Sequence, residues 1–215
     1  TGGPVTRTMT ITVYPSPTVS FIADDTFVCP GTPITFTSTS IPGVSGAMTY
    51  MWNFGDGSFS TAPTPAHAYS TPGYFTVTLS VTTSMGCVST LTIPMFVHIF
   101  TPPVPNFYAS VRRICGGSGS TSFTNMTTGT PGFTYSWNFG DGGTSTLANP
   151  THFYSAPGAY TVTLTVVDGN GCTNTLVSTA YIVVGTITAA FTNPATACKF
   201  SSVVFTNTSS THISS

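Results

Sequence analysis

Charged side chains are scarce in this 215-residue sequence. Lysine and arginine together number four, aspartate and glutamate together number five, and the formal net charge is −1. Nucleic-acid binding needs clustered basic side chains that neutralise phosphates, so the composition argues against a nucleic-acid partner. It also leaves few charges to steer any other partner by long-range attraction. Glutamate and glutamine, both strong helix formers, are missing, which favours strands over helices.

Long apolar runs are also missing. No stretch approaches the roughly 18 consecutive apolar residues of a membrane-spanning helix, so we expect no membrane span. Apolar residues nevertheless make up 40% of the chain, with 16 Phe and 9 Tyr. Charge-rich disordered segments lack such residues, so this chain is expected to bury a core.

The sequence repeats itself at an offset of 85 residues, as from Trp52 to Trp137. The repeated motifs are Trp-Asn-Phe-Gly-Asp-Gly (52–57 and 137–142), Pro-x-His-x-Tyr (65–69 and 150–154) and Pro-Gly-x-(Phe/Tyr)-Thr-Val-Thr-Leu (72–79 and 157–164). Such internal self-similarity indicates tandem copies of one structural unit.

The register of the repeat divides the chain into four parts. Residues 18–103 and 104–187 are predicted to be two full domains. Residues 1–17 resemble the end of each copy and are predicted to be the closing strand of a preceding module. Residues 188–215 are predicted to begin a third module. We therefore expect the sequence to be a window from a longer array.

Alternation of apolar and hydroxyl side chains predicts half-buried strands, as in 75–81 and 160–166. Each copy holds about seven such strands, which indicates an all-β fold of tandem immunoglobulin-like sandwiches. Trp52 and Trp137 are expected between the sheets as core residues. Asp56 and Asp141, each between two glycines, are expected to organise tight turns.

Together these motifs resemble the PKD domain, the polycystic-kidney-disease repeat. The resemblance rests on the Trp motif, on His67 and Tyr69 in the first copy, and on His152 and Tyr154 in the second. It implies an immunoglobulin-type sandwich used in surface and secreted proteins as a spacer, adhesive or glycan-binding module. The cysteine-bearing variant is similar to tandem repeats in secreted surface proteins of gliding Bacteroidetes-type bacteria.

Five cysteines fit the repeat as one early and one late cysteine in each full copy. We predict the disulfides Cys29–Cys87 and Cys115–Cys172, with Cys198 paired outside this window. Disulfides of this kind imply an oxidising, extracellular setting. Free or metal-bound thiols are the rival interpretation, although no Cys-x-x-Cys motif occurs.

Motifs that carry chemistry are few. Each copy has one motif histidine, His67 or His152, and we expect its imidazole N–H to anchor a carbonyl of a neighbouring loop. No nucleophile elbow, zinc-protease motif or dinucleotide fingerprint occurs, so no enzymatic activity and no cofactor are expected. The adjacent pair Asp24 and Asp25 is a weak candidate for Ca²⁺, which usually needs several carboxylates. Asn125 and Asn207 stand in N-glycosylation sequons.

Three functions remain open. The favoured one is an extracellular, non-enzymatic stalk or filament subunit of the bacterial cell surface, with other copies or neighbouring repeats as partners. Its linkers, such as 100–105, are proline-rich and therefore semi-rigid. The second is adhesion to surface glycans through Phe59, Tyr108 and Phe133, which are expected in loops. The third is a set of accessory repeats in a larger secreted hydrolase.

Overall fold

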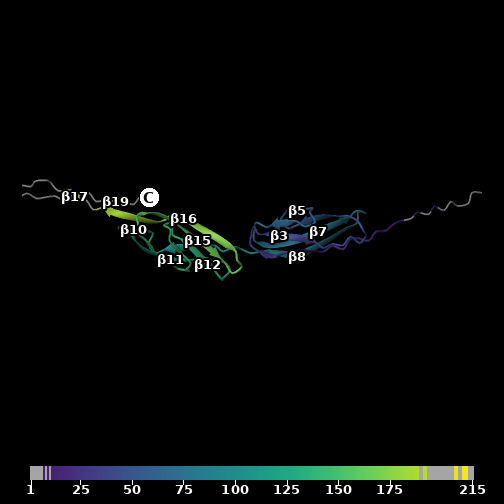
Figure 1. The fold of residues 1–215 in the computed structure, drawn as a ribbon, viewed down its shortest axis with the longest axis horizontal. Coiled ribbons are helices and arrows are strands. Elements are labelled where there is room, and N and C mark those ends of the chain that lie inside the picture. The colour runs from purple at the N-terminus through teal and green to yellow at the C-terminus, as the bar shows by residue number, and fades with distance from the viewer. Residues whose placement is uncertain are drawn as a thin grey trace, which may run out of the picture. The chain divides into compact units, whose positions relative to one another are not determined.

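The computed structural model describes residues 7, 9, 11–188, 191–192, 206–207 and 210–212. Every regular element in this part of the chain is a β-strand. The chain divides into two compact units, Thr1–Thr101 and Pro102–Ser215, and each contains one sandwich (Figure 1). We call these sandwiches the first and second module. Within the described residues there is no helix that could cross a membrane.

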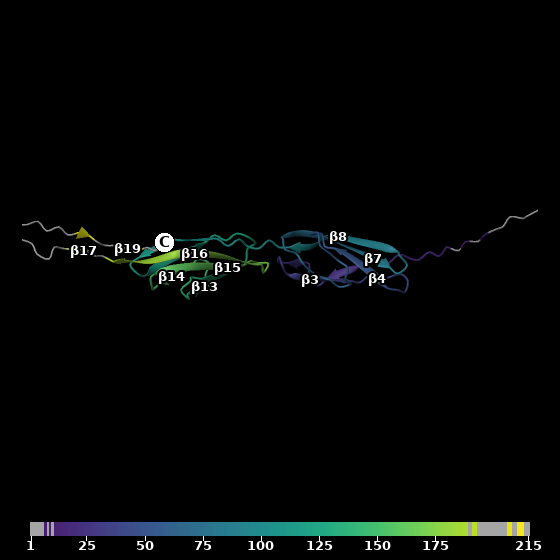
Figure 2. The same ribbon diagram turned by 90° about the horizontal axis from the view of Figure 1, so that it is seen from above.

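The first module is built from two sheets. Its strands are β1 (Phe21–Ala23), β2 (Phe27–Val28), β3 (Pro33–Ser38), β4 (Met48–Asn53), β5 (Phe59–Ser60), β6 (Ala66–Ala68), β7 (Gly73–Thr83) and β8 (Val88–Ile99). One sheet has the order β1-β3-β6 and the other β2-β8-β7-β4-β5. All pairings are antiparallel except that of β2 with β8. Figure 2 shows β3 and β8 in separate layers.

The second module repeats this topology. Its strands are β9 (Phe107–Ala109), β10 (Arg113–Cys115), β11 (Gly119–Asn125), β12 (Thr134–Asn138), β13 (Thr144–Ser145), β14 (Thr151–Tyr154), β15 (Gly158–Val167) and β16 (Thr173–Thr188). The sheet orders are β9-β11-β14 and β10-β16-β15-β12-β13. Beyond them, β17 (Phe191–Thr192) pairs with β18 (Thr206–Asn207), and β19 (Ser210–His212) pairs with the end of β16.

The all-β, immunoglobulin-like prediction is confirmed, with eight described strands in each module rather than about seven. The difference comes from the two-residue strands β5 and β13. Each forms because the Gly-Asp-Gly turn returns the chain alongside the strand that carries the tryptophan. So short a strand leaves no period-two pattern in the sequence.

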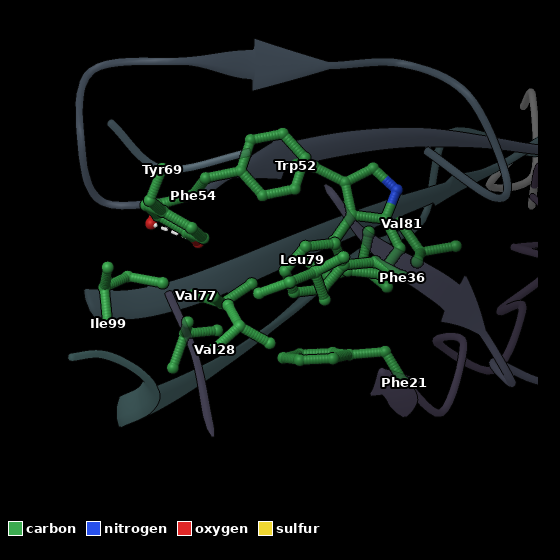
Figure 3. Close-up of a cluster of buried hydrophobic side chains, with 12 residues drawn as sticks. Phe21, Val28, Phe36, Trp52, Phe54, Tyr69, Val77, Leu79, Val81 and Ile99 are labelled. Atoms are coloured by element: carbon green, nitrogen blue, oxygen red, sulfur yellow. Dashed lines mark hydrogen bonds between the residues drawn. The ribbon is translucent and has the colours of Figure 1, made fainter. Parts of the chain in front are cut away.

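The alternation in β7 divides its side chains between core and surface. Val77, Leu79 and Val81 are fully buried. The hydroxyls between them face outward and pair with β8, as Ser80 does with Thr90 at 2.7 Å. Figure 3 shows the buried side chains of this module gathered around one tryptophan. The second module has a matching core.

Both modules carry the same irregularity in the long hairpin. The register of β7 and β8 shifts between Phe75 and Val77, and that of β15 and β16 shifts between Tyr160 and Val162. Opposite the shift, Met95 and Ala180 both have φ of 49°. A bulge of this kind bends the strands and increases their twist, which helps the sheet wrap its core.

The predicted end segments have different outcomes. Residues 11–17 form no strand, and the sandwich begins with a bridge between Thr18 and Ile41. Most of residues 188–215, including Cys198, lies outside the described residues. The assignment of both ends to neighbouring modules, like the boundary at residue 103, stays a prediction.

Candidate functional site

The Gly-Asp-Gly turn is fixed by side chains that accept backbone hydrogen bonds. Oδ1 of Asp56 accepts the N–H of Ser58 at 2.9 Å, and Oδ1 of Asn53 accepts the N–H of Gly55 at 2.9 Å. The turn is closed by the N–H of Phe54, which donates to the carbonyl of Ser58 at 3.2 Å. Asp56 is therefore part of the turn itself.

His67, on β6, ties the three-stranded sheet to this turn. Its Nε2 lies 2.8 Å from Oδ2 of Asp56. One face of the imidazole stacks on Phe54, with ring centroids 4.2 Å apart, and Tyr69 meets the ring edge-on at 4.6 Å. The prediction that the imidazole of His67 binds a loop carbonyl is wrong, because its partner is a carboxylate. The carboxylate is the acceptor because the turn and β6 face each other across the two sheets.

Trp52 and Tyr69 satisfy their polar atoms on backbone carbonyls. The indole Nε1 of Trp52 donates to the carbonyl of Ala62 at 2.9 Å. The hydroxyl of Tyr69 donates to the carbonyl of Phe54 at 3.0 Å, which is drawn in Figure 3. Both side chains are almost completely buried. Burial of large aromatic groups is thus achieved without leaving a donor unpaired.

The second module reproduces each contact. The corresponding distances are 2.8 Å for His152–Asp141, 4.1 Å for the His152–Phe139 ring centroids, 2.9 Å for Trp137 Nε1 to the Leu147 carbonyl, and 3.2 Å for the Tyr154 hydroxyl to the Phe139 carbonyl. Asp141 also accepts the N–H of Gly143 at 2.9 Å. Because the same contacts recur at nearly the same distances, the motif residues have the same structural role in both modules.

Hydrogen bonding sets the charge state of the two carboxylates. Partial burial would raise the pKa of Asp56, but the N–H of Ser58 and the imidazole of His67 outweigh it, so the pKa lies below its ordinary value. Asp141 has the same balance, with His152 and the N–H of Gly143 lowering its pKa against burial. Burial raises the pKa of the Tyr69 and Tyr154 phenols.

A histidine beside a carboxylate is two-thirds of a hydrolytic triad, so the surroundings of this pair decide its role. Here Phe54 covers one face of the imidazole, and the second oxygen of Asp56 is committed to the turn. Ser58 contributes its backbone N–H to the carboxylate. Within the described residues, no three His, Cys, Asp or Glu side chains converge as a metal site would require. The arrangement locks a turn onto a strand.

Asp24 and Asp25, the candidate Ca²⁺ pair, are also turn residues. Oδ1 of Asp24 accepts the backbone N–H groups of Thr35 and Asp25, each at 2.9 Å. Oδ1 of Asp25 accepts those of Thr26 and Phe27 at 2.6 and 2.9 Å. Hydrogen bonds from Thr35 hold the pKa of Asp24 below its ordinary value. Two carboxylates already turned toward backbone donors are a poor fit to a cation that takes six to eight oxygens.

The predicted pairing of cysteines within a module is wrong. Cys87 and Cys115 have free thiols, whereas Cys29 and Cys172 are disulfide-bonded. Cys29 follows β2, whose Val28 pairs with the last residue of β8. Cys87 lies in the hairpin at the other end of β8, about 36 Å away at the usual rise per residue. A disulfide requires Cα atoms within about 7 Å, so the length of the strand forbids this bond.

The second module separates its cysteines in the same way. Cys115 pairs with Gly185 near one end of β16, and Cys172 immediately precedes its other end. Sequence alignment of the copies identified equivalent cysteines correctly but could not show that the two kinds lie at opposite ends of a long hairpin.

The candidate glycosylation and glycan-binding residues are dispersed. Oδ1 of Asn125 accepts both the N–H and the hydroxyl of Thr127, at 3.0 and 2.6 Å. Asn207 lies in β18, and nothing further of it is described. Phe59 and Tyr108 are exposed on strands rather than in loops, and Phe133 packs partly against the core.

One surface feature was not found from the sequence. A groove of about 630 Å³ runs beside β4 in the first module. Its lining residues are Met48, Thr49, Tyr50, Met51, Thr61, Pro63, Ser80 and Thr82. The β4 residues that line the groove, Met48 to Met51, are consecutive and show only ordinary strand alternation in the sequence, so no local pattern marks the groove.

Two stretches of the sequence, residues 14–97 and 101–184, each match the PKD domain family. The chain belongs to the PKD domain family. The two matches coincide with the two sandwiches, so the PKD fold accounts for both modules. Its motif residues are those that close the turn, fill the core and hold β6.

Similar segments occur in bacterial proteases. The PKD chain is 68% identical over 37 residues to Collagenase ColA of Bacillus cereus, which is 17% of this chain and 4% of that protein. It is 50% identical over 46 residues to the microbial collagenase of Vibrio alginolyticus, 21% of this chain and 6% of that protein. The chain thus matches only a small part of these relatives.

Among solved structures, the PKD1 domain of the Vibrio cholerae metalloprotease PrtV is similar over 40% of this chain and 99% of that domain. The sequence identity is 28% and the TM-score is 0.34.

Proposed function

We propose that this chain is a pair of non-catalytic accessory PKD modules of a larger secreted hydrolase. The observation that carries the proposal is the family match together with the identity to short segments of two collagenases. Those segments cover 4% and 6% of the collagenases, as expected of an accessory domain beside a catalytic one.

The internal use of the motif supports a non-enzymatic role. The polar side-chain atoms of the motif are already hydrogen-bonded inside the module. Those of Trp52 and Tyr69 donate to backbone carbonyls, and that of His67 contacts the carboxylate of the turn. Catalysis requires such groups to converge on a substrate, with a nucleophile or metal beside them. In this proposal the modules act as spacers that position the protein, and a separate domain carries the catalytic site.

An extracellular location follows from the same proposal. Disulfide-bonded Cys29 and Cys172 fit an oxidising compartment, since cytosolic thiols are kept reduced. Attachment to the cell surface is not needed by this proposal.

The stalk or filament hypothesis draws less support. Its basis is the low charge of the sequence, which leaves few charged residues to discourage edge-to-edge pairing of strands. Neither the family match nor the relatives bear on polymerisation. Glycan binding likewise stays a prediction, with the groove beside β4 as the place to test it.

The proposal is tested on the native protein. An antibody raised against residues 18–187 is used to precipitate its antigen from the culture medium of the source cells. We expect a protein much longer than 215 residues that hydrolyses gelatin or another polymer in the precipitate. Ordered fibres of constant diameter without hydrolytic activity would instead establish the filament hypothesis and overturn the proposal.

A further inference from the structure

Two adjacent arginines line a small pocket in the second module. Arg112 and Arg113 surround a volume of about 270 Å³ together with Ala180, Tyr181 and Val183. The pocket lies where β10 runs parallel to β16, with Arg113 in register with Val183. Lysine and arginine together number only four in the whole sequence. The positive charge of this chain is therefore concentrated at one place in the second module.

Arg112 is held in position by β16. Its carbonyl accepts the N–H of Val183 at 2.8 Å. Its guanidinium lies over the ring of Tyr181, with Cζ 4.3 Å from the ring centroid, and its Nε donates to the Tyr181 carbonyl at 3.3 Å. The N–H groups on its two Nη atoms have no partner among the described residues and can donate to a ligand.

Tyr181 is itself fixed to the core of the module. Its hydroxyl accepts the N–H of Ala109 at 3.3 Å, and its ring meets that of Phe107 edge-on with centroids 5.0 Å apart. Phe107 belongs to the buried cluster around the tryptophan. The guanidinium of Arg112 thus rests on a rigid support, which reduces the entropy that a ligand must pay to order it.

No carboxylate neutralises these arginines within the part of the chain that the structure describes. Of the aspartates in the second module, Asp141 contacts His152 and organises its turn. Asp168 accepts backbone N–H groups beside Cys172, at the opposite end of β16. Two neighbouring like charges repel each other, so an anion placed between them is favoured.

The first module shows that the fold does not require the arginine pair. There the N–H of His98 donates to the carbonyl of Thr26 at 2.8 Å, just as Val183 donates to Arg112. Thr26 and the following Phe27 therefore occupy the places of the two arginines. The same backbone carries basic side chains in one module and uncharged ones in the other, which indicates that the pair serves something other than folding.

The space for a ligand comes from the bulge in β16. Ala180 lies at this bulge with φ of 49°, and Met95 has the same place and the same φ in the first module. The Met95 side chain is 68% exposed and extends from the sheet. Alanine has only a methyl group at this point, so the pocket beside the arginines stays open.

We propose that this pocket binds a carboxylate group of an acidic polysaccharide. The planar, two-oxygen carboxylate matches the fork of N–H donors on a guanidinium. The apolar side chains of Ala180 and Val183 suit the C–H face of a sugar ring. The volume lies below the roughly 300–1,000 Å³ of pockets that enclose drug-sized ligands, so it fits a single ring of a longer chain.

A polysaccharide fits this pocket better than a nucleic acid does, because binding to a phosphate backbone needs many clustered cations. The inference goes beyond the proposed function, since the pocket would bind its ligand whether or not a catalytic domain is attached. It also concerns a different surface from the groove beside β4, whose lining is uncharged.

The ligand class is tested by affinity electrophoresis of the 215-residue chain in gels that contain sodium polygalacturonate. Fully methyl-esterified polygalacturonate, the same chain without charge, is the matched probe, and poly-glutamate tests a polypeptide source of carboxylates. We expect retardation by polygalacturonate that added NaCl weakens, and little by the other two probes. Equal retardation by the methyl ester, or by poly-glutamate, would overturn the proposal.

Variants locate the site. Arg113→Gln removes an exposed guanidinium that has no described partner, and we expect binding about three- to tenfold weaker with an unchanged Tm. Arg7→Gln removes the same charge outside the pocket and is the matched control, with unchanged binding. Ala180→Met should weaken binding by filling the pocket without a change of charge. Equal binding by the Arg113→Gln and Arg7→Gln proteins would show that the arginine pocket is not the site.

Discussion

Nε2 of His67 lies 2.8 Å from Oδ2 of Asp56, and the same distance separates His152 from Asp141 in the second module. In each module this pair joins β6 or its counterpart β14 to the Gly-Asp-Gly turn, so two segments from different sheets are held together at one point. The other carboxylate oxygen organises the turn itself. The contact is therefore structural, and its loss should be measured as a loss of stability.

The lowered pKa values of Asp56 and Asp141 predict acid sensitivity. A carboxyl whose pKa is depressed in the folded state stabilises the protein above its unfolded pKa, near 3.8, and loses that contribution as the pH falls through the lower folded value. The free energy of unfolding, measured with urea, should therefore decrease below about pH 4. The double variant Asp56→Asn with Asp141→Asn should be less stable at pH 7 and show a shallower decrease. An equally steep acid transition in that variant would mean that other groups control it.

Removal of the buried tyrosine hydroxyl should destabilise the first module. Tyr69→Phe leaves the Phe54 carbonyl without its donor, which we expect to cost about 1–2 kcal/mol. Unfolding is followed by fluorescence in a Trp137→Phe background, so that Trp52 alone reports. Tyr74→Phe, at a side chain that is 62% exposed, is the matched control and should change stability by less than about 0.5 kcal/mol. Equal effects at both positions would contradict the role given to Tyr69.

Gly55 and Gly57 flank the same aspartate but should differ in tolerance. Both have positive φ, 84° and 91°. A Cβ at Gly55 would overlap the backbone carbonyl oxygen of Thr76, whereas one at Gly57 would meet no atom within 4 Å. Gly57→Ala should cost about 1–2 kcal/mol from the backbone alone, and Gly55→Ala clearly more. Thermal unfolding of the two variants measures this, and a Gly55→Ala protein as stable as Gly57→Ala would refute the close approach.

Truncation of the central tryptophan should be the most damaging change in the second module. Trp137→Ala leaves a cavity among Phe107, Phe123 and Phe139, and we expect a loss of about 3–5 kcal/mol. Phe153→Ala, at a side chain that is 55% exposed, is the control and should be nearly neutral. Hydrogen exchange of the β15–β16 amides provides the measurement. Unchanged protection in Trp137→Ala would show that the indole is not a core residue.

Much of the fold could be predicted because short-range sequence patterns determine it. Period-two alternation located the long strands, and the offset from Trp52 to Trp137 revealed two copies. The burial of both indoles also followed from alternation. These features depend on residues that are neighbours in the chain, or on their repetition.

The rest depends on distances that only the folded chain sets. The early and late cysteines seemed to be natural partners until the length of β7 and β8 placed them at opposite ends of a module. His67 and Asp56 meet because β6 crosses to the turn, which no local pattern records. The two-residue strand β5 is likewise a product of that turn.

The central claim is that the His–Asp pairs serve the fold and perform no reaction. The most direct test is calorimetric unfolding of the double variant His67→Ala with His152→Ala, with hydrolysis of gelatin and ester substrates assayed on the same samples. We predict a lower Tm in the variant, and no hydrolysis by either the variant or the unaltered chain. A variant with unchanged Tm that loses a hydrolytic activity present in the unaltered chain would contradict the account.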